Sequence, residues 1–281
     1  MSIKYSILIA HYNSVSTLSY CLNSALNQEF DRKDYEIVVY DDASSEDISI
    51  IDELKNPRIK LYSGDVNNGV GFAKRYLVEV SIGKYFLFLD ADDYLDLNAL
   101  SIFDQIIDNS DCSFYYADSR LLSNDGNVVL RAKGRSFEYT GSMLSYFYKY
   151  PIFHPVLFSR NHYYLTNGID TRMKVAEDID LFLKMEEVGK GLFVDKVLYN
   201  YRKSDISLSQ VKKLDKKIRC ILFQFISGIS ASERRSIDFE RLVDETANEI
   251  IRLQKKDLIK GSLLFRIKFI IKQILDLIFR L

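Results

Sequence analysis

Tryptophan is absent from this sequence of 281 residues, and proline and cysteine occur only three times each. The shortage of proline, together with only twelve glycines, indicates few long loops. The cysteines, Cys21, Cys112 and Cys220, stand far apart between apolar residues and show neither a metal-binding spacing nor a disulfide framework. We therefore expect buried thiols in a protein of a reducing compartment.

Long apolar runs are also missing, so a membrane-spanning helix is not expected. The first residues, MSIKY, lead straight into a strand pattern and lack the shape of a signal peptide. A formal net charge of −1 offers no overall attraction for nucleic acid. With 47% apolar and 27% charged residues, the composition is that of a globular protein. We expect a cytoplasmic protein with no nucleic-acid partner.

Short apolar runs alternate with helical spacing along the first two thirds of the chain. The predicted strands lie at 5–10, 35–40, 58–62, 85–89, 113–121, 128–132 and 192–201. The predicted helices begin after Asn13-Ser14, which can cap the first one, and cover 48–54, 72–82, 97–107 and 176–188. This alternation predicts an α/β fold with a mostly parallel sheet flanked by helices.

Beyond residue 208 the strand signals fade, which predicts a domain over 1–208 and a helical region over 209–281. Within 263–281, apolar residues share one helical face and basic residues the other. Such a basic amphipathic helix can lie on an anionic membrane surface, and it can equally pack on the protein itself or on a second subunit. A peripheral contact with the inner face of the membrane is one expectation.

Polar residues follow three of the predicted strands at the point where each strand ends. These are Tyr12-Asn13, Asp41-Asp42 and the cluster from Asp90 to Asp93. In parallel sheets, ligands bind at the carboxyl ends of the strands. The sequence therefore predicts a ligand site along this edge.

Each polar cluster has a structural explanation beside a chemical one. Asp90 and Asp92 offer hard oxygen ligands for magnesium or manganese, although a turn capped by Asp93 or Asp96 explains them equally well. Asp42 can accept hydrogen bonds from a nucleobase or ribose, or form an Asx turn.

The segments Asn67–Arg75 and Glu177-Asp178 are two further candidates. The first is a loop entering a helix, which can present backbone N–H groups and Lys74 or Arg75 to phosphate. The second opens a helix, where acidic residues are favoured by the dipole. At such a place Asp178 could also act as a general base.

Taken together, six ordered segments resemble the inverting family 2 glycosyltransferases, which have the GT-A fold. The segments are SILIAHYN, EIVVYDDASSED, NNGVGFAKR, GKYFLFLDADD, VAEDIDLFLKM and VLYNYR, and the resemblance covers Ser2 to Ser204. It implies a nucleotide-sugar donor, with UDP as the expected nucleotide, a Mn²⁺ or Mg²⁺ cofactor, and a glycan or lipid-linked acceptor in polysaccharide or glycolipid biosynthesis.

The resemblance also implies a role for individual residues. Asp178 would be the catalytic base and Asp92 would hold the metal. The expected donor-binding residues are Ala10, Tyr12, Asp42, Lys74, Asp90, Ala91 and Arg202. The chain departs from the family at Ala10-His11, where proline or threonine is usual, and at Ala43, where glycine is usual. The absence of a QxxRW motif argues against the processive, membrane-embedded polymerases related to cellulose synthase.

Two other functions remain open at this point. A sugar nucleotidyltransferase would also use an α/β sheet, but its glycine-rich basic loop is missing after the first strand. A non-catalytic glycosyltransferase-like protein that binds a partner or glycan would have no reason to keep Asp42, Asp90, Asp92 and Asp178 together.

Overall fold

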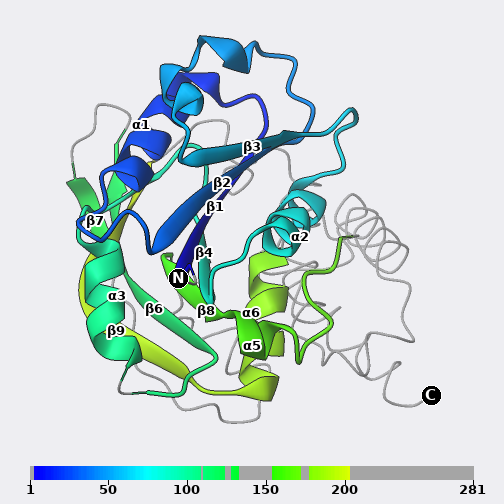
Figure 1. The fold of residues 1–281 in the computed structure, drawn as a ribbon. Coiled ribbons are helices and arrows are strands. Elements are labelled where there is room, and N and C mark those ends of the chain that lie inside the picture. Colours follow the sequence, from blue (N-terminus) through cyan, green and yellow to red (C-terminus); the bar gives the residue numbers. More distant parts are fainter. Residues whose placement is uncertain (1–2, 109, 124–127, 133–153, 172–176, 203–281) are drawn as a thin grey trace, which may run out of the picture. The chain divides into compact units, whose positions relative to one another are not determined.

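The computed structural model describes residues 3–108, 110–123, 128–132, 154–171 and 177–202 (Figure 1). The chain divides into two units, Met1–Asp205 and Ile206–Leu281, and all described residues belong to the first. The predicted helices beyond residue 209, the amphipathic segment 263–281 among them, lie outside the described residues. The domain boundary after residue 208 therefore stays a prediction.

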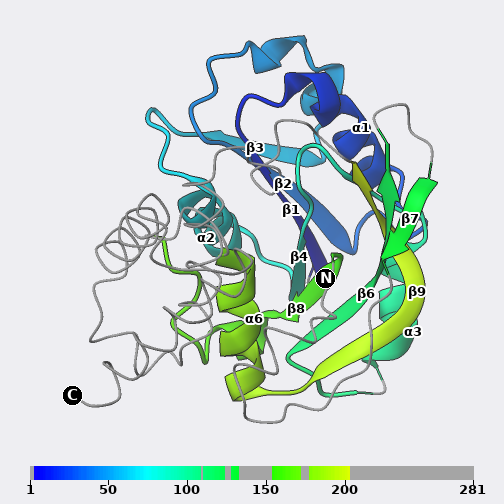
Figure 2. The same cartoon turned by 180° about the vertical axis from the view of Figure 1, so that it is seen from behind.

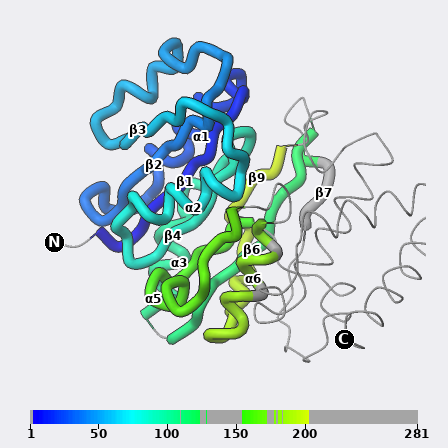
Figure 3. Tube along the Cα trace, turned by 90° about the vertical axis from the view of Figure 1, so that its right-hand side faces the viewer, coloured from blue at the N-terminus to red at the C-terminus, as the bar shows by residue number. Residues whose placement is uncertain are grey.

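Nine strands of the described part of the chain form one sheet in the order β3-β2-β1-β4-β8-β6-β9-β5, with β7 paired to β6. The strands are β1 (Tyr5–His11), β2 (Tyr35–Asp41), β3 (Ile59–Ser63), β4 (Tyr85–Phe88), β5 (Tyr94–Leu95), β6 (Phe114–Leu122), β7 (Val128–Ala132), β8 (Val156–Ser159) and β9 (Gly191–Arg202). The strands β3, β2, β1 and β4 lie side by side (Figure 3). All of their pairings are parallel. The expected mostly parallel α/β fold is confirmed, with antiparallel strands concentrated in the other half.

Helices cover both faces of the sheet (Figures 1 and 2). The helices are α1 (Val15–Leu26), α2 (Val70–Val80), α3 (Ala99–Ile107), α5 (Arg160–Tyr163) and α6 (Glu177–Val188). Residues of α1 and α3 share one core cluster with the strands, and residues of α2, α5 and α6 share the other. None of the helices in the described segments is long and apolar enough to cross a bilayer.

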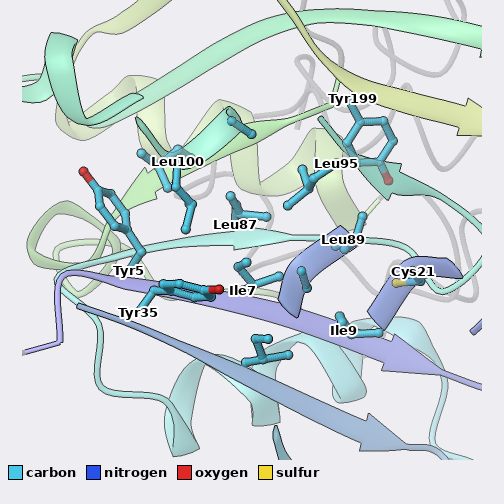
Figure 4. Close-up of a cluster of buried hydrophobic side chains, with 14 of the residues drawn as sticks. Tyr5, Ile7, Ile9, Cys21, Tyr35, Leu87, Leu89, Leu95, Leu100 and Tyr199 are labelled. Carbon is cyan, nitrogen blue, oxygen red and sulfur yellow. The ribbon is translucent and has the colours of Figure 1, made fainter. Parts of the chain in front are cut away.

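The core on the α1 side takes every second side chain of the central strands. Ile7, Ile9, Leu87 and Leu89 are fully or almost fully buried there, and Cys21 of α1 packs with them (Figure 4). The thiol of Cys21 is free, as expected from the sequence. Successive side chains of a strand point to opposite faces, so Leu8 and Phe88 instead join the core under α2 and α6.

Three local predictions were wrong or incomplete. The expected helix over 48–54 is replaced by two 3-10 turns, η1 (Ile48–Ile50) and η2 (Asp52–Lys55), because the backbone is extended at Ile51 between them. Ser14 does not cap α1 with its side chain; Glu46 accepts the Val15 N–H at 2.9 Å instead. Strands β5 and β8 were missed, since both are short.

Ala43, which follows the second strand, has a backbone φ of 59°. An alanine in the left-handed region clashes with its own backbone, whereas glycine does not. We expect Ala43→Gly to raise the free energy of unfolding by about 0.5–1 kcal/mol, after allowance for the greater freedom of glycine in the unfolded chain. Urea denaturation would measure this, and an Ala43→Gly protein less stable than the native chain would contradict it.

Candidate functional site

The ends of three parallel strands meet at one edge of the sheet. His11 of β1 stands opposite Asp41 of β2, and Asp42 donates its N–H to the His11 carbonyl at 2.9 Å. On the other side of β1, the Leu89 N–H donates to the Leu8 carbonyl at 2.9 Å. The segments Ala10–Tyr12, Asp41-Asp42 and Asp90–Asp93 therefore lie at the ends of β1, β2 and β4, which are neighbours in the sheet (Figure 1).

Asn13 joins the first two of these segments. Its side-chain oxygen accepts the Ser45 N–H at 2.9 Å, and its own N–H donates to Ser44 Oγ at 2.9 Å. Asn13 has a positive φ of 48°, which asparagine tolerates better than most residues. The side chain of the preceding Tyr12 is half exposed at this edge. Tyr12 is therefore accessible from solvent at this edge.

Asp42 is buried and holds the loop before α2. One carboxylate oxygen accepts the Asn68 N–H at 2.9 Å and the other accepts the Gly69 N–H at 2.7 Å. Each oxygen keeps a second lone pair. Asp42 therefore has a structural task beside the base contact that the resemblance implies.

Replacing Asp42 with asparagine leaves only one oxygen for two backbone donors. We expect Asp42→Asn to lower the free energy of unfolding by about 0.5–1.5 kcal/mol, since one of two partly buried N–H groups loses its acceptor. Urea denaturation measures the stability, and calorimetry with UDP shows whether nucleotide affinity falls too. Unchanged stability would mean that the loop does not depend on this carboxylate. Asp47→Asn, an exposed turn aspartate, is the control.

The carboxylates of the acidic turn from Asp90 to Asp93 lie in different environments. Asp93 is buried and accepts hydrogen bonds from the Tyr199 hydroxyl at 2.8 Å and the Arg202 N–H at 2.7 Å. Its burial and the nearby charges of Asp90 and Asp92 raise its pKa well above the usual range. Asp93 thus joins the turn to β9. Sequence reasoning offered Asp93 only as a helix cap and missed Tyr199, which lies 106 residues away.

Asp92 lacks such a structural task. Among the described residues, no side chain donates a hydrogen bond to its carboxylate or pairs with it. Partial burial and the charge of Asp90 raise the pKa of Asp92, so its ionised form is destabilised. Bound Mn²⁺ or Mg²⁺ would stabilise the ionised form of Asp92, and carboxylate oxygen is a suitable ligand for both ions.

The residues around Asp92 do not form a metal site by themselves. Within the described segments, no group of three or more His, Cys, Asp or Glu side chains is arranged to hold an ion. A metal at Asp92 would therefore take fewer than three such ligands from the described segments. The carboxylate of Asp92 fits a hard divalent cation such as Mn²⁺ or Mg²⁺.

Lys74 is a buried cation between two acidic residues. Its ammonium lies 2.7 Å from Glu177 Oε1, 3.7 Å from Asp90 Oδ1 and 5.4 Å from the centre of the Phe88 ring. Burial by itself would lower the pKa of Lys74, but the charges of Glu177, Asp90 and Asp178 outweigh it and raise that pKa. Lys74 is therefore charged in the folded protein.

The other basic residue of the same loop and helix points elsewhere. Arg75 pairs with Glu79 and donates to the carbonyls of Asn167 and Ile169. These contacts join α2 to the segment after α5. Of the two basic residues that the sequence offered for phosphate, only Lys74 contacts the acidic edge of the sheet.

Asp178 lines a pocket at this edge. The pocket is also lined by Lys74, Phe88, His154, Phe158, Ile169, Glu177, Leu181 and Phe182. Its walls are largely apolar, and Asp178 is only partly buried. The sequence could not say whether Asp178 faces the strand ends, and it left His154 unassigned; the structure brings both into one pocket with Lys74.

Arg202 ends the described part of β9 next to the acidic turn. Its N–H donates to Asp93, and its guanidinium lies 5.1 Å from the centre of the Tyr20 ring of α1. The charge of Arg202 opposes the rise in the pKa of Asp92. The residues predicted for the site, Ala10, Tyr12, Asp42, Lys74, Asp90, Ala91, Asp92, Asp178 and Arg202, thus belong to segments that the structure gathers at the same edge.

Several known proteins are similar to this chain. Chondroitin synthase of Pasteurella multocida (strain Pm70) is 29% identical over 205 residues, which are 69% of this chain and 20% of that protein. The beta-1,3-glucosyltransferase WfaP of Escherichia coli, which acts with UDP-Glc on alpha-D-GlcNAc-diphosphoundecaprenol, is 37% identical over 90 residues, 32% of this chain and 35% of that protein. The chain thus spans between a fifth and about a third of these relatives.

A solved structure has a fold similar to that of this chain. Residues 1–349 of S. aureus TarS in complex with UDP-GlcNAc superpose with a TM-score of 0.63 at 21% identity, covering 79% of this chain and 66% of that one. The family model described as glycosyl transferase family 2 matches residues 6–165, which include every predicted site residue except Asp178 and Arg202. The chain therefore belongs to glycosyl transferase family 2.

Proposed function

We propose that this protein transfers a sugar from a UDP-sugar to a glycan or lipid-linked acceptor with inversion at the anomeric carbon. The observation that carries the proposal is the meeting of Asp42, the Asp90–Asp92 turn and Asp178 at one edge of the sheet. Two relatives support UDP as the nucleotide, since WfaP uses UDP-Glc and TarS was solved with UDP-GlcNAc.

The nucleotide is proposed to lie over the ends of β1 and β2. Tyr12 is half exposed and can stack on the base, with the small Ala10 beside it and the spare lone pairs of Asp42 as acceptors. Asp90, whose side chain is 36% exposed, would accept a hydrogen bond from a ribose hydroxyl. Ala91 leaves room next to it, and Arg202 supplies positive charge on the phosphate side.

Asp92 would hold the Mn²⁺ or Mg²⁺ together with the diphosphate. When bound, the ion would neutralise the negative charge that develops on the leaving diphosphate. Asp92 is suited to this because its carboxylate has no side-chain partner among the described residues.

Asp178 is proposed to be the general base. Its carboxylate takes the proton of the acceptor hydroxyl while the hydroxyl oxygen bonds to the anomeric carbon. The bond from that carbon to the diphosphate oxygen breaks, and UDP leaves with the bonding electron pair. Attack from the face opposite UDP inverts the configuration. Asp178 is only partly buried, which leaves part of its side chain accessible to an acceptor.

A lipid-linked acceptor would place the protein on the cytoplasmic face of a membrane. WfaP acts on an undecaprenol-linked sugar, and the basic amphipathic segment predicted at 263–281 could contact anionic lipid. This part of the proposal depends on the sequence of that segment.

A panel of UDP-sugars with Mn²⁺ tests the proposed function. We expect one donor to bind and to be slowly hydrolysed without an acceptor, and hydrolysis to stop when EDTA removes the metal. Binding without any turnover would favour a non-catalytic glycan-binding protein. Formation of a UDP-sugar from UTP and a sugar phosphate would identify a nucleotidyltransferase instead.

A further inference from the structure

The buried side chain of Lys74 contacts both the acidic turn after β4 and the start of α6. It lies on α2, Asp90 follows β4, and Glu177 is the first residue of α6. We propose that Lys74 is a positioning residue, which holds the start of α6 against the acidic turn and so places the Asp178 carboxylate. This inference rests on the proposed function.

The Lys74–Glu177 pair is closely enclosed. The lysine side chain is 6% exposed and the glutamate side chain 8%, and their charged atoms are 2.7 Å apart. The Phe88 ring packs near the ammonium at 5.4 Å. A buried carboxylate without its cation is strongly unfavourable, so loss of the Lys74 charge would destabilise Glu177 at this place.

Holding Glu177 also sets the rotation of α6 about its axis. Consecutive residues of an α-helix point about 100° apart, so a fixed Glu177 directs Asp178 to one side of it. Glu177 and Asp178 line the same pocket. The 3.7 Å contact between Lys74 and Asp90 ties that pocket to the turn that carries Asp92. The distance between the proposed base and the proposed donor site thus depends on one ammonium group.

A direct role in donor binding is the competing explanation. The Lys74 residue is only 5% exposed and already contacts two carboxylates. A phosphate oxygen would have to displace one of them. A positioning residue and a donor-binding residue lead to different kinetics, because the first affects turnover and the second affects donor affinity.

Four variants separate these roles: Lys74→Met, Lys74→Arg, Glu177→Gln and the double variant Lys74→Met/Glu177→Gln. Lys60→Met is the matched control, since Lys60 pairs at 2.8 Å with the buried Glu36, near the start of β2. UDP affinity with Mn²⁺, the kcat and KM for the donor, and hydrogen exchange of the α6 amides are measured for each.

We expect Lys74→Met to lower kcat by about 10- to 100-fold, the scale of a misplaced catalytic group, with the donor KM and the UDP affinity within about threefold. Glu177→Gln should lower kcat to a similar extent. The double variant should be no worse than the poorer single one, because both substitutions break the same contact. Lys74→Arg should retain most of the activity, and Lys60→Met all of it. Hydrogen exchange of the α6 amides should be faster than in the native protein in Lys74→Met, but not in Lys74→Arg or Lys60→Met.

Two results would overturn the inference. If Lys74→Met loses UDP affinity in proportion to its loss of kcat/KM, Lys74 is a donor-binding residue. If the loss of kcat in the double variant equals the product of the two single losses, Lys74 and Glu177 act independently. If Lys74→Met does not fold, the double variant still tests the inference, since it leaves no charge unpaired in that contact. Absence of transfer activity in the native protein would contradict the proposed function. Unchanged hydrogen exchange of the α6 amides in Lys74→Met would contradict the inference that Lys74 holds the start of α6.

Discussion

Asp178→Asn is expected to lower kcat for sugar transfer by about 10²–10⁴-fold while leaving UDP affinity within about twofold. The amide has nearly the same shape as the carboxylate but cannot take a proton from the acceptor hydroxyl. Because Asp178 lines the pocket next to Lys74 and is not part of the β1 and β2 ends, nucleotide binding should persist. Transfer rates at saturating donor and calorimetry with UDP measure the two quantities.

Glu187→Gln serves as the control, because Glu187 is exposed near the other end of the same helix. It removes the same negative charge from α6 without changing the pocket. Full transfer activity in Asp178→Asn would show that another group accepts the proton. Equal losses in both variants would point to the charge of the helix rather than to a base.

Asp92→Ala is expected to remove the effect of Mn²⁺ on UDP binding and to lower kcat by about 10²–10³-fold. Without this carboxylate, the ion loses its proposed protein ligand, and no group of three acidic, histidine or cysteine side chains in the described residues could replace it. Electrostatic stabilisation of a developing charge is commonly of this size. Calorimetry with UDP, with and without Mn²⁺, and donor turnover would test both effects.

The control for Asp92 is Asp111→Ala, which removes an exposed aspartate just before β6. It should keep the metal effect on UDP binding. If Asp92→Ala also keeps that effect, the metal is held elsewhere or the donor binds without it. A variant that loses UDP affinity even without metal would indicate that Asp92 contacts the nucleotide directly.

The acidic turn shows why carboxylates with nearly the same local sequence have different tasks. Asp93 is buried against Tyr199 and Arg202, Asp90 faces Lys74, and Asp92 has no side-chain partner among the described residues. Three carboxylates so close together repel one another. The structure satisfies Asp93 with donors and Asp90 with a cation, which leaves Asp92 as the group that would benefit most from a metal.

The sequence by itself determined the strands that carry the site and the edge where it lies. Apolar runs rich in β-branched and aromatic side chains favour buried strands at 5–10, 35–40 and 85–89, and an acidic cluster follows each of the last two runs. Parallel pairing then brings the strand ends together, so the position of Asp42 and Asp92 at one edge could be predicted without coordinates.

Only the tertiary structure decided what each of these side chains contacts. Lys74 and Glu177 meet across 103 residues, Asp93 and Tyr199 across 106, and Glu46 rather than Ser14 satisfies the first N–H of α1. Periodicity reports only which face of an element is buried, because it depends on neighbours three or four residues away. Pairs so distant in sequence depend on how whole helices pack on the sheet, and that packing selects which buried charge receives a partner.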